Sequence, residues 1–377
     1  MKLKEYQKKC LKDIELYLQF LSEHKKIYDE NVETFKKLDV EYNFPEKAWN
    51  QCEIKNINGE PIAYNSKKNG LNEPLPNFCI KVPTGGGKTL LATRTIDLIN
   101  SIYLKKKTGL VLWIVPTNQI YRQTINNLRD REHPYRQVLD LSSGGRTLIL
   151  EKGDRFTTQD VNENLIIMML MLPSANRQNK ETLKIFQDAG GFDSFFPPDD
   201  DFKAHEELIE KFPNLDYFGE KDSFLGRQVK TSLGNVLRIL KPIIIIDEGQ
   251  KAYSENAQRT IRNFNPSIVV ELSATPPRGS NPISNITGQD LNREEMIKLD
   301  IHVINKATTN WKDVVLASVE KRNSLEKLAK QYESQTGQYI RPICLIQVER
   351  TGRNQVNSEY IHAEHVKNYL MNECGIS

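Results

Sequence analysis

The chain has 377 residues, of which 38% are hydrophobic and 27% charged, so the composition is that of a globular protein with two or three domains. Its 52 basic and 49 acidic residues leave a formal net charge of +3, which neither demands nor excludes a nucleic-acid partner. The apolar runs are shorter than the ~18 residues that span a bilayer, and MKLKEYQKKC at the N-terminus is too charged for a signal peptide. The five cysteines are widely spaced and form no CxxC pair, so we expect reduced thiols, a cytoplasmic protein and no membrane partner.

The predicted elements alternate between helices and strands. Apolar residues at helical spacing predict one or two helices over residues 3–37, and the polar stretch 40–75 is predicted to be irregular or a small insertion. Strand-like runs then recur: FCIKV (78–82), LVLWIV (110–115), LIIMML (165–170), IIII (243–246) and SIVVELS (267–273). This alternation is typical of an α/β fold whose parallel sheet is covered by helices on both faces, and the four isoleucines predict its most buried strand.

Two later stretches interrupt this alternation. Residues 187–230 contain GGFDSFFPPDDDF and have little periodicity, so we expect an insertion on the surface. Residues 275–312 contain TPPRGSNPISNITG, a composition that predicts a linker.

The last part of the chain predicts the beginning of a second α/β domain. A helix is expected at about 313–335, then the strand RPICLIQV at 341–348, then a helix at about 360–373. The expected division is therefore a first domain over residues 1–310 and the start of a second over 311–377.

A glycine-rich turn follows the first predicted strand. Gly85, Gly86 and Gly87 join that strand to a helical pattern that begins with Lys88 and Thr89. Glycines allow backbone N–H groups to converge on phosphate oxygens, because a side chain would block the approach, and the helix N-terminus adds its dipole. Lysine at this position reaches the β- and γ-phosphates of a nucleotide, and threonine supplies a hydroxyl to Mg²⁺. The turn therefore predicts an ATP-binding loop.

The turn departs from the strict pattern G-x-x-x-x-G-K-[ST]. Val82 stands where that pattern has its first glycine, so the match is to the variant P-T-G-x-G-K-T, in which Thr84 and Gly85 make the tight turn. A glycine-rich turn with an incidental lysine is the alternative, and the flanking strand and helix argue against it.

An acidic pair follows the isoleucine strand in PIIIIDEGQ. Asp247 and Glu248 emerge at the carboxyl end of a buried strand, where ligands bind in open α/β sheets. We expect Asp247 to hold Mg²⁺ through its water, and Glu248 to orient and deprotonate the water that attacks ATP. Alone, such a pair can simply cap a strand, but beside a phosphate-binding turn it indicates a site for ATP hydrolysis.

The motifs resemble those of the superfamily-two helicases and translocases, the DEAD/DEAH-like group. More narrowly, the chain is similar to the ATPase subunit of type III restriction enzymes, the Res subunit family. KVPTGGGKT is similar to motif I, DEGQ (247–250) to motif II and ELSATPP (271–277) to motif III, and the resemblance covers nearly the whole chain. It implies RecA-like domains, ATP with Mg²⁺, and DNA as the polymer that the motor contacts.

Three further stretches support the resemblance. Gln7, in the pair Tyr6-Gln7, matches the adenine-reading glutamine of the Q motif. Thr117, Asn118 and Arg122 lie in IVPTNQIYRQT, which is similar to motif Ia and implies contacts to the nucleic-acid backbone, although these side chains could merely cover a helix. RPICLIQV resembles the strand that carries motif IV.

Motif II differs from the family pattern at one position. Gln250 stands where DEAH-type members carry histidine, the residue that couples the ATP site to motif III. A glutamine is both donor and acceptor, so it can still bridge to the hydroxyls of Ser273 and Thr275, which the resemblance assigns to coupling. We therefore expect Gln250 to act in catalysis together with Lys88 and Glu248.

The family's second domain also supplies an arginine to the γ-phosphate, from a stretch Q-x-x-G-R-x-x-R. Arg353 in ERTGRNQ follows the motif IV strand too soon to match it. Because such an arginine contributes about 10³–10⁵ in rate, we expect an N-terminal fragment of a longer protein that binds ATP·Mg²⁺ and turns it over slowly. In the family, a nuclease follows the helicase domains.

The leading hypothesis is an ATP-dependent DNA translocase or helicase motor of a restriction or related defence system. The resemblance implies a modification methyltransferase subunit as partner, and phosphate contacts imply no choice of DNA sequence by this region. One alternative is an RNA helicase, which the motifs do not distinguish. Another is a nucleotide-gated binding subunit without turnover, although Glu248 argues against it because a pure binding site needs no water-activating carboxylate.

Overall fold

The computed structural model describes most of the chain as two compact units, Met1–Lys298 and Leu299–Ser377. The described residues are 2–56, 58–171, 190–220, 226–249, 254–296, 304–305, 310–349, 351 and 360–376. Within them, no helix combines the length and the apolar character that a membrane crossing requires.

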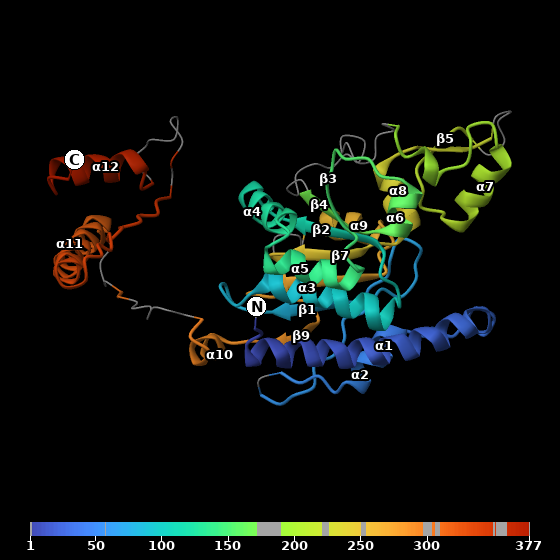
Figure 1. The fold of residues 1–377 in the computed structure, drawn as a ribbon, viewed down its shortest axis with the longest axis horizontal. Helices are drawn as coiled ribbons and strands as arrows, with labels where there is room; N and C mark the ends of the chain where they lie inside the picture. Colours follow the sequence, from blue (N-terminus) through green and yellow to red (C-terminus); the bar gives the residue numbers. More distant parts are fainter. Residues whose placement is uncertain are drawn as a thin grey trace. The chain divides into compact units, whose positions relative to one another are not determined.

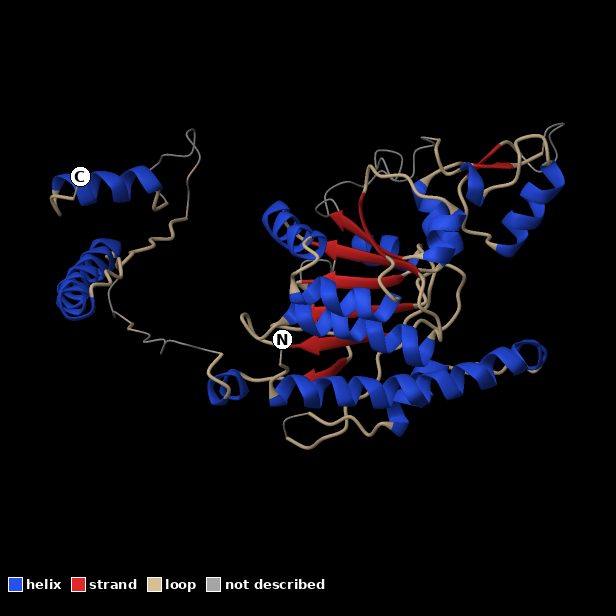
Figure 2. Cartoon of the chain, in the orientation of Figure 1, coloured by secondary structure: helices blue, strands red, loops and turns tan. Residues whose placement is uncertain are grey.

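A seven-stranded parallel sheet forms the centre of the first unit (Figures 1 and 2). Its strand order is β3-β4-β2-β7-β8-β1-β9. The strands are β1 (Asn77–Lys81), β2 (Gly109–Val115), β3 (Thr147–Glu151), β4 (Leu165–Met171), β7 (Ile243–Asp247), β8 (Ile268–Ser273) and β9 (Pro282–Asn285). The predicted α/β, RecA-like sheet is thus confirmed, and its five central strands are the five that the sequence predicts. The edge strands β3 and β9 were not predicted.

The central strands are largely apolar runs, and consecutive residues of a strand point to opposite faces. Both faces of the sheet are therefore apolar. In β7, Ile243 and Ile245 belong to one core, whereas Ile244 and Ile246 belong to the other. All five residues of this strand are buried, and it pairs with β2 on one side and β8 on the other. The isoleucine run therefore lies inside the sheet, as predicted, and the acidic pair follows it directly.

Helices cover both faces of the sheet (Figure 1). The first face packs against α1 (Glu5–Lys37), α2 (Phe44–Gln51), α3 (Lys88–Leu98), α4 (Asn118–Arg129) and α5 (Pro134–Ser143). The second face packs against α6 (Thr158–Glu163), α8 (Leu233–Leu240) and α9 (Glu255–Arg262). A π-helical turn (Ile99–Tyr103) extends α3, and α10 (Gly288–Arg293) follows β9. The helix predicted over residues 3–37 is therefore one helix, on the first face.

The stretch 40–75, predicted to be irregular or a small insertion, contains α2 and contributes to the core. Phe44 and Trp49 are buried, and the Trp49 ring lies edge-on to Tyr17 of α1. The Trp49 indole donates a hydrogen bond of 2.7 Å to the Ile62 carbonyl. The helix is only eight residues long and has few apolar positions, so its sequence shows no clear period.

The insertion predicted over residues 187–230 contains, in its described part, a short 3₁₀ turn (Asp193–Phe195), α7 (Phe202–Lys211) and a two-stranded antiparallel sheet. The two strands are β5 (Tyr217–Phe218) and β6 (Gln228–Val229). They pack with α7 around a small core of Ile209, Phe212, Leu215 and Val229.

The second unit contains α11 (Trp311–Thr336) and α12 (Ala363–Asn372), and their bounds are close to those of the two helices that the sequence predicts. Val315, Val366 and Tyr369 form its small core. The strand predicted at 341–348 is not formed: Ile343 and Leu345 are 83% and 93% exposed. A strand requires a hydrogen-bonded neighbour, and the described residues of this unit supply none. Its assignment as the beginning of a second RecA-like domain therefore stays a prediction.

Candidate nucleotide site

The glycine-rich turn joins β1 to α3, and each of its three glycines is required for a different reason. Gly85 has φ +84° with open space around it, so it is needed for its left-handed backbone. At Gly86, a Cβ atom would lie 2.5 Å from Val82 Cγ2. At Gly87, φ is +86° and a Cβ atom would lie 2.6 Å from the side-chain nitrogen of Gln7. The loop is therefore a backbone cradle that depends on glycine, through its left-handed conformation at Gly85 and Gly87 and through close neighbours at Gly86 and Gly87.

The helix that follows this loop presents free backbone donors. Gly87 is the N-cap of α3 and offers no side chain to the amides of the first turn, which begins with Lys88 and Thr89. Such a terminus attracts anions through its N–H groups and its dipole. Thr84 is exposed at the start of the cradle, and Thr89 is half-buried behind it.

Lys88 and the acidic pair come together although they are 160 residues apart in the sequence. The Lys88 ammonium forms an ion pair with the Glu248 carboxylate, and their side chains are 11% and 23% exposed. Strands β1 and β7 flank β8 in the sheet and end at the same edge, so α3 can reach across to the residue that follows β7. The predicted convergence of the phosphate loop and the acidic pair is therefore present in the fold.

Asp247 is buried beside this ion pair. One of its carboxylate oxygens accepts a hydrogen bond of 3.0 Å from the Glu248 backbone N–H. Burial raises the pKa of Asp247, the Lys88 charge opposes that rise, and the Glu248 charge adds to it. Glu248 has φ +52°, a left-handed conformation that is uncommon outside glycine and that turns the chain away from β7. The site is thus two carboxylates and one ammonium in a largely desolvated corner.

The first turn of α1 packs against the cradle. The Tyr6 hydroxyl donates to the Gly86 carbonyl at 3.1 Å, and the Gln7 amide nitrogen donates to the same carbonyl at 3.2 Å. The Gln7 amide oxygen accepts from the Lys4 backbone N–H at 3.0 Å, and the residue is 1% exposed. Both ends of this amide are therefore engaged with the protein, and adenine recognition by Gln7, which stays a prediction, requires that one of these bonds be exchanged for the base.

Motif III begins within the last residues of the neighbouring strand, β8. Ser273 ends β8, its carbonyl accepts from the Val82 N–H at 3.0 Å, and its hydroxyl accepts from the Thr275 N–H at 3.1 Å. These bonds tie the start of motif III to the strand end that leads into the cradle. Gln250, predicted to join them, lies outside the described residues.

A family model described as "Type III restriction enzyme, res subunit" matches residues 1–278, which is most of the chain. The chain belongs to this family. The family is one of superfamily-two helicase-like domains, so the resemblance read from the motifs is confirmed. No curated protein matches the chain.

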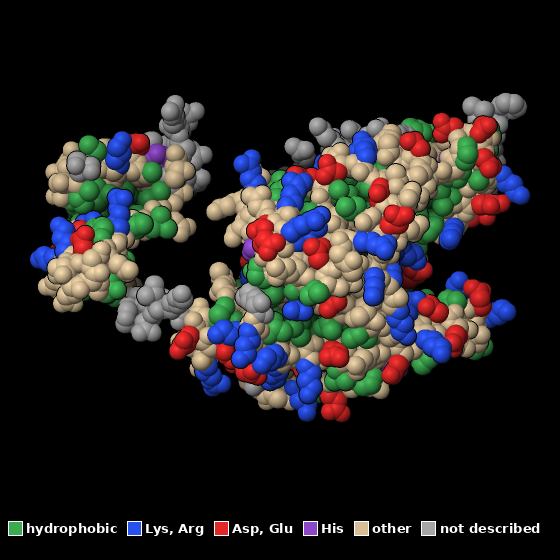
Figure 3. Space-filling view, in the orientation of Figure 1, with side chains coloured by type: hydrophobic (Ala, Val, Ile, Leu, Met, Phe, Trp, Pro, Cys, Tyr) green, Lys and Arg blue, Asp and Glu red, His purple; other side chains and the backbone are tan. Residues whose placement is uncertain are grey.

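In this Res-family chain, the motif Ia residues lie at the start of α4, which follows β2. The Thr117 hydroxyl accepts from the Ile120 N–H at 3.4 Å and so caps the helix. Asn118 and Arg122 are exposed on its first turns. Basic and acidic side chains are interspersed over the face drawn in Figure 3. Binding of nucleic acid at this face would therefore depend on individual exposed side chains such as Asn118 and Arg122. Contact by these three residues stays a prediction.

Replacing Arg122 by alanine is expected to weaken DNA binding similarly for all sequences, because a phosphate contact carries no base information. The slope of log affinity against log salt concentration should fall by about 1. Fluorescence anisotropy with two unrelated duplexes over a salt series measures both effects. Arg131→Ala, at another exposed arginine, is the matched control. An unchanged slope would mean that Arg122 does not contact a phosphate.

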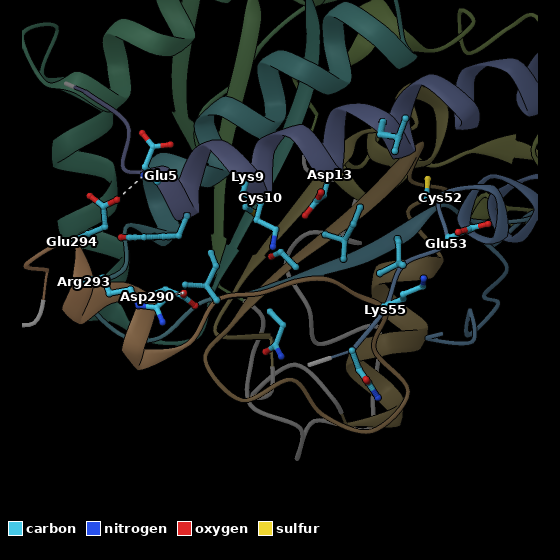
Figure 4. A pocket seen from close by; sticks show the side chains of 18 residues that line it. Glu5, Lys9, Cys10, Asp13, Cys52, Glu53, Lys55, Asp290, Arg293 and Glu294 are labelled. Atoms are coloured by element: carbon cyan, nitrogen blue, oxygen red, sulfur yellow. Dashed lines mark hydrogen bonds and ion pairs between the residues drawn. The ribbon is translucent and has the colours of Figure 1, made fainter. Parts of the chain in front are cut away.

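A cavity of about 770 Å³, lined in part by Tyr6, lies between the start of α1, the 52–56 loop, β9 and α10 (Figure 4). Asp13, Lys9 and Cys10 line it from α1, and Arg293 lines it from α10. None of the described residues assigned to the nucleotide contributes to its lining. The cavity is therefore separate from the phosphate cradle, although Tyr6 borders both.

Replacing Gln7 by alanine should lower the preference for ATP over GTP by about tenfold, the value of one good hydrogen bond in a desolvated site. Competition of the two nucleotides for the purified chain measures the ratio. Gln19→Ala, at an exposed glutamine of the same helix, is the control. An equal loss of affinity for both nucleotides would instead assign Gln7 to holding the cradle, and a parent chain that uses ATP and GTP equally would contradict adenine recognition.

Proposed function

We propose that this chain is the ATP-binding part of a DNA translocase or helicase motor of a type III restriction or related defence system, and that it binds and hydrolyses ATP with Mg²⁺. Membership of the Res family supports a helicase-like motor. The proposal of ATP hydrolysis rests on the contact between Lys88 of the cradle and Glu248 of the acidic pair, with Asp247 buried beside them.

The triphosphate would lie along the cradle with its β- and γ-phosphates at the N-terminus of α3. Backbone N–H groups of Gly85–Gly87 and of the first helical turn would donate to its oxygens, and Lys88 would neutralise their charge. The three glycines support this assignment, since Gly85 and Gly87 have left-handed backbone and a Cβ atom at Gly86 or Gly87 would collide with Val82 or Gln7. Thr84 would shape the turn at the entrance.

Thr89 and Asp247 have the donor set for Mg²⁺, a hydroxyl and a carboxylate, which hard divalent cations prefer. The fit is supported by Asp247 itself, whose buried carboxylate has a raised pKa and so lacks full compensation of its charge. When bound, Mg²⁺ would supply positive charge that neutralises the phosphates.

Glu248 would accept the proton of the attacking water. The water oxygen bonds to the γ-phosphorus as the bond from that phosphorus to the bridging oxygen of ADP breaks, and the proton passes to the Glu248 carboxylate. Glu248 is paired with Lys88. The γ-phosphate would give Lys88 a new anionic partner and so release Glu248 towards the attacking water.

The experiment is ATP hydrolysis by the purified chain with Mg²⁺, with and without DNA or RNA of matched length. Hydrolysis above the background without enzyme, stimulated more by DNA than by RNA, is the expected result. Stimulation by RNA alone would favour an RNA helicase, and tight ATP binding without turnover in either polymer would favour a nucleotide-gated binding subunit. A modification methyltransferase subunit is proposed as the partner, and the absence of co-purification after co-expression with one would count against it.

A further inference from the structure

A charged pair is buried beneath the turn that carries the acidic residues. Glu271 lies inside β8, two residues before Ser273, and its carboxylate is 3.2 Å from the ammonium of Lys67. Their side chains are 3% and 15% exposed. Burying such a pair costs desolvation that the attraction often fails to recover, so stability is a weak reason for its presence in a central strand. A role in fixing positions is the better explanation.

Glu271 touches the turn that follows β7. It is opposite Ile246 in the register of the two strands, one residue before the acidic pair begins. The left-handed conformation of Glu248 then brings the chain over β8, so that a Cβ atom on Gly249 would lie 3.4 Å from Glu271 Cβ and 3.9 Å from a carboxylate oxygen. The Glu271 side chain therefore packs against Gly249, the residue that follows Glu248.

Lys67 lies in the segment 65–75, which we call the strap. The strap forms hydrogen bonds to the segments that follow motifs II and III. At one end, the Asn65 N–H donates to the Asn281 side chain at 2.7 Å, beyond motif III. In the middle, the Gly70 N–H donates to the carbonyl of Arg262 at 2.8 Å, at the end of the helix that follows motif II. The backbone on either side of Lys67 is thus anchored by hydrogen bonds to the segments that follow motifs II and III.

The pair lies on the opposite face of the sheet from α3. Val270 and Leu272, the neighbours of Glu271 in β8, pack into the core that contains α3, so Glu271 itself points the other way. Loss of the pair would leave the phosphate cradle intact and would free the turn that positions Glu248 relative to Ser273.

We propose that Lys67 and Glu271 are positioning residues that hold the Asp247–Gly249 turn against β8 and so keep Glu248 in place for hydrolysis. This inference rests on the proposed motor function. The pair is therefore expected to affect turnover and the order of the turn, with ATP affinity unchanged.

The test is the double variant Lys67→Met with Glu271→Gln in the full chain, since removing both charges leaves neither unpaired. The KM for ATP should stay within twofold of the parent, whereas kcat with saturating DNA should fall at least tenfold. Lys67→Arg, which keeps the charge, should retain most of the stimulated rate. The matched control is Lys68→Met with Glu41→Gln, because this neighbouring lysine of the strap pairs with an exposed carboxylate at 3.0 Å.

Amide hydrogen exchange at Glu248 and Gly249 supplies a measurement that does not depend on hydrolysis. It should be at least tenfold faster in the double variant than in the parent or the control. A stimulated kcat within twofold of the parent, or unchanged exchange, would overturn the proposal. So would a melting temperature that falls together with activity, because the pair would then serve stability. A parent chain that shows no hydrolysis refutes the motor function separately, and the exchange measurement still decides the role of the pair.

Discussion

Replacing Lys88 by alanine should abolish measurable ATP binding at micromolar concentrations. The variant removes the cation that the cradle offers to the β- and γ-phosphates. Truncating one member of a desolvated charge pair costs about 2–5 kcal/mol, or roughly 30- to 5,000-fold in affinity. Titration of the chain with a fluorescent ATP analogue and Mg²⁺ measures the change.

Lys107→Ala is the matched control for Lys88, because Lys107 is exposed in the connection between β1 and β2. It should bind ATP as the parent does. If Lys88→Ala retained affinity within twofold of this control, the assignment of the glycine-rich turn to the phosphates would be wrong.

Replacing Glu248 by glutamine should separate binding from hydrolysis. The amide cannot take the proton of the attacking water, and a positioned general base contributes about 10²–10⁴ in rate, so kcat should fall by that factor. ATP should bind at least as tightly as to the parent, because Lys88 no longer has the Glu248 carboxylate as a competing anionic partner. Single-turnover hydrolysis together with equilibrium binding measures both effects.

Glu132→Gln is the control for this second variant, since Glu132 is an exposed glutamate on the same unit. An unchanged hydrolysis rate in Glu248→Gln would favour a subunit that binds nucleotide without using this carboxylate. Weaker binding with an unchanged rate constant would assign Glu248 to holding the nucleotide.

The sequence predicts the centre of the fold and of the site because their signals are local. Four isoleucines before Asp247 indicate a buried strand, and three glycines before Lys88 indicate a phosphate loop whatever the rest of the chain does. The order of the sheet then brings these two segments to one edge. The common edge follows from the rule that ligands bind at the carboxyl ends of parallel strands, whereas the order β7-β8-β1 comes only from the fold.

What the sequence does not predict depends on contacts between distant segments. The edge strand β9 is four residues long and begins with a proline, and Trp49 joins the core from a stretch that is otherwise polar. Lys67 belongs to the lysine-rich strap, and only the fold puts it beside Glu271. Glu271 was included in an apolar strand run, and a charge inside such a run is the one signal that could have drawn attention to a buried partner.

The central claim is that the glycine-rich cradle and the acidic pair hold one triphosphate and its metal. A crystal structure of the chain with a non-hydrolysable ATP analogue and Mn²⁺, located by its anomalous scattering, tests it most directly. We expect Lys88 at about 3 Å from the β- and γ-phosphate oxygens, the metal bound to the Thr89 hydroxyl, and a metal-bound water within hydrogen-bonding distance of the Asp247 carboxylate. A nucleotide bound elsewhere, or a metal far from Asp247 while the phosphates occupy the cradle, would contradict it.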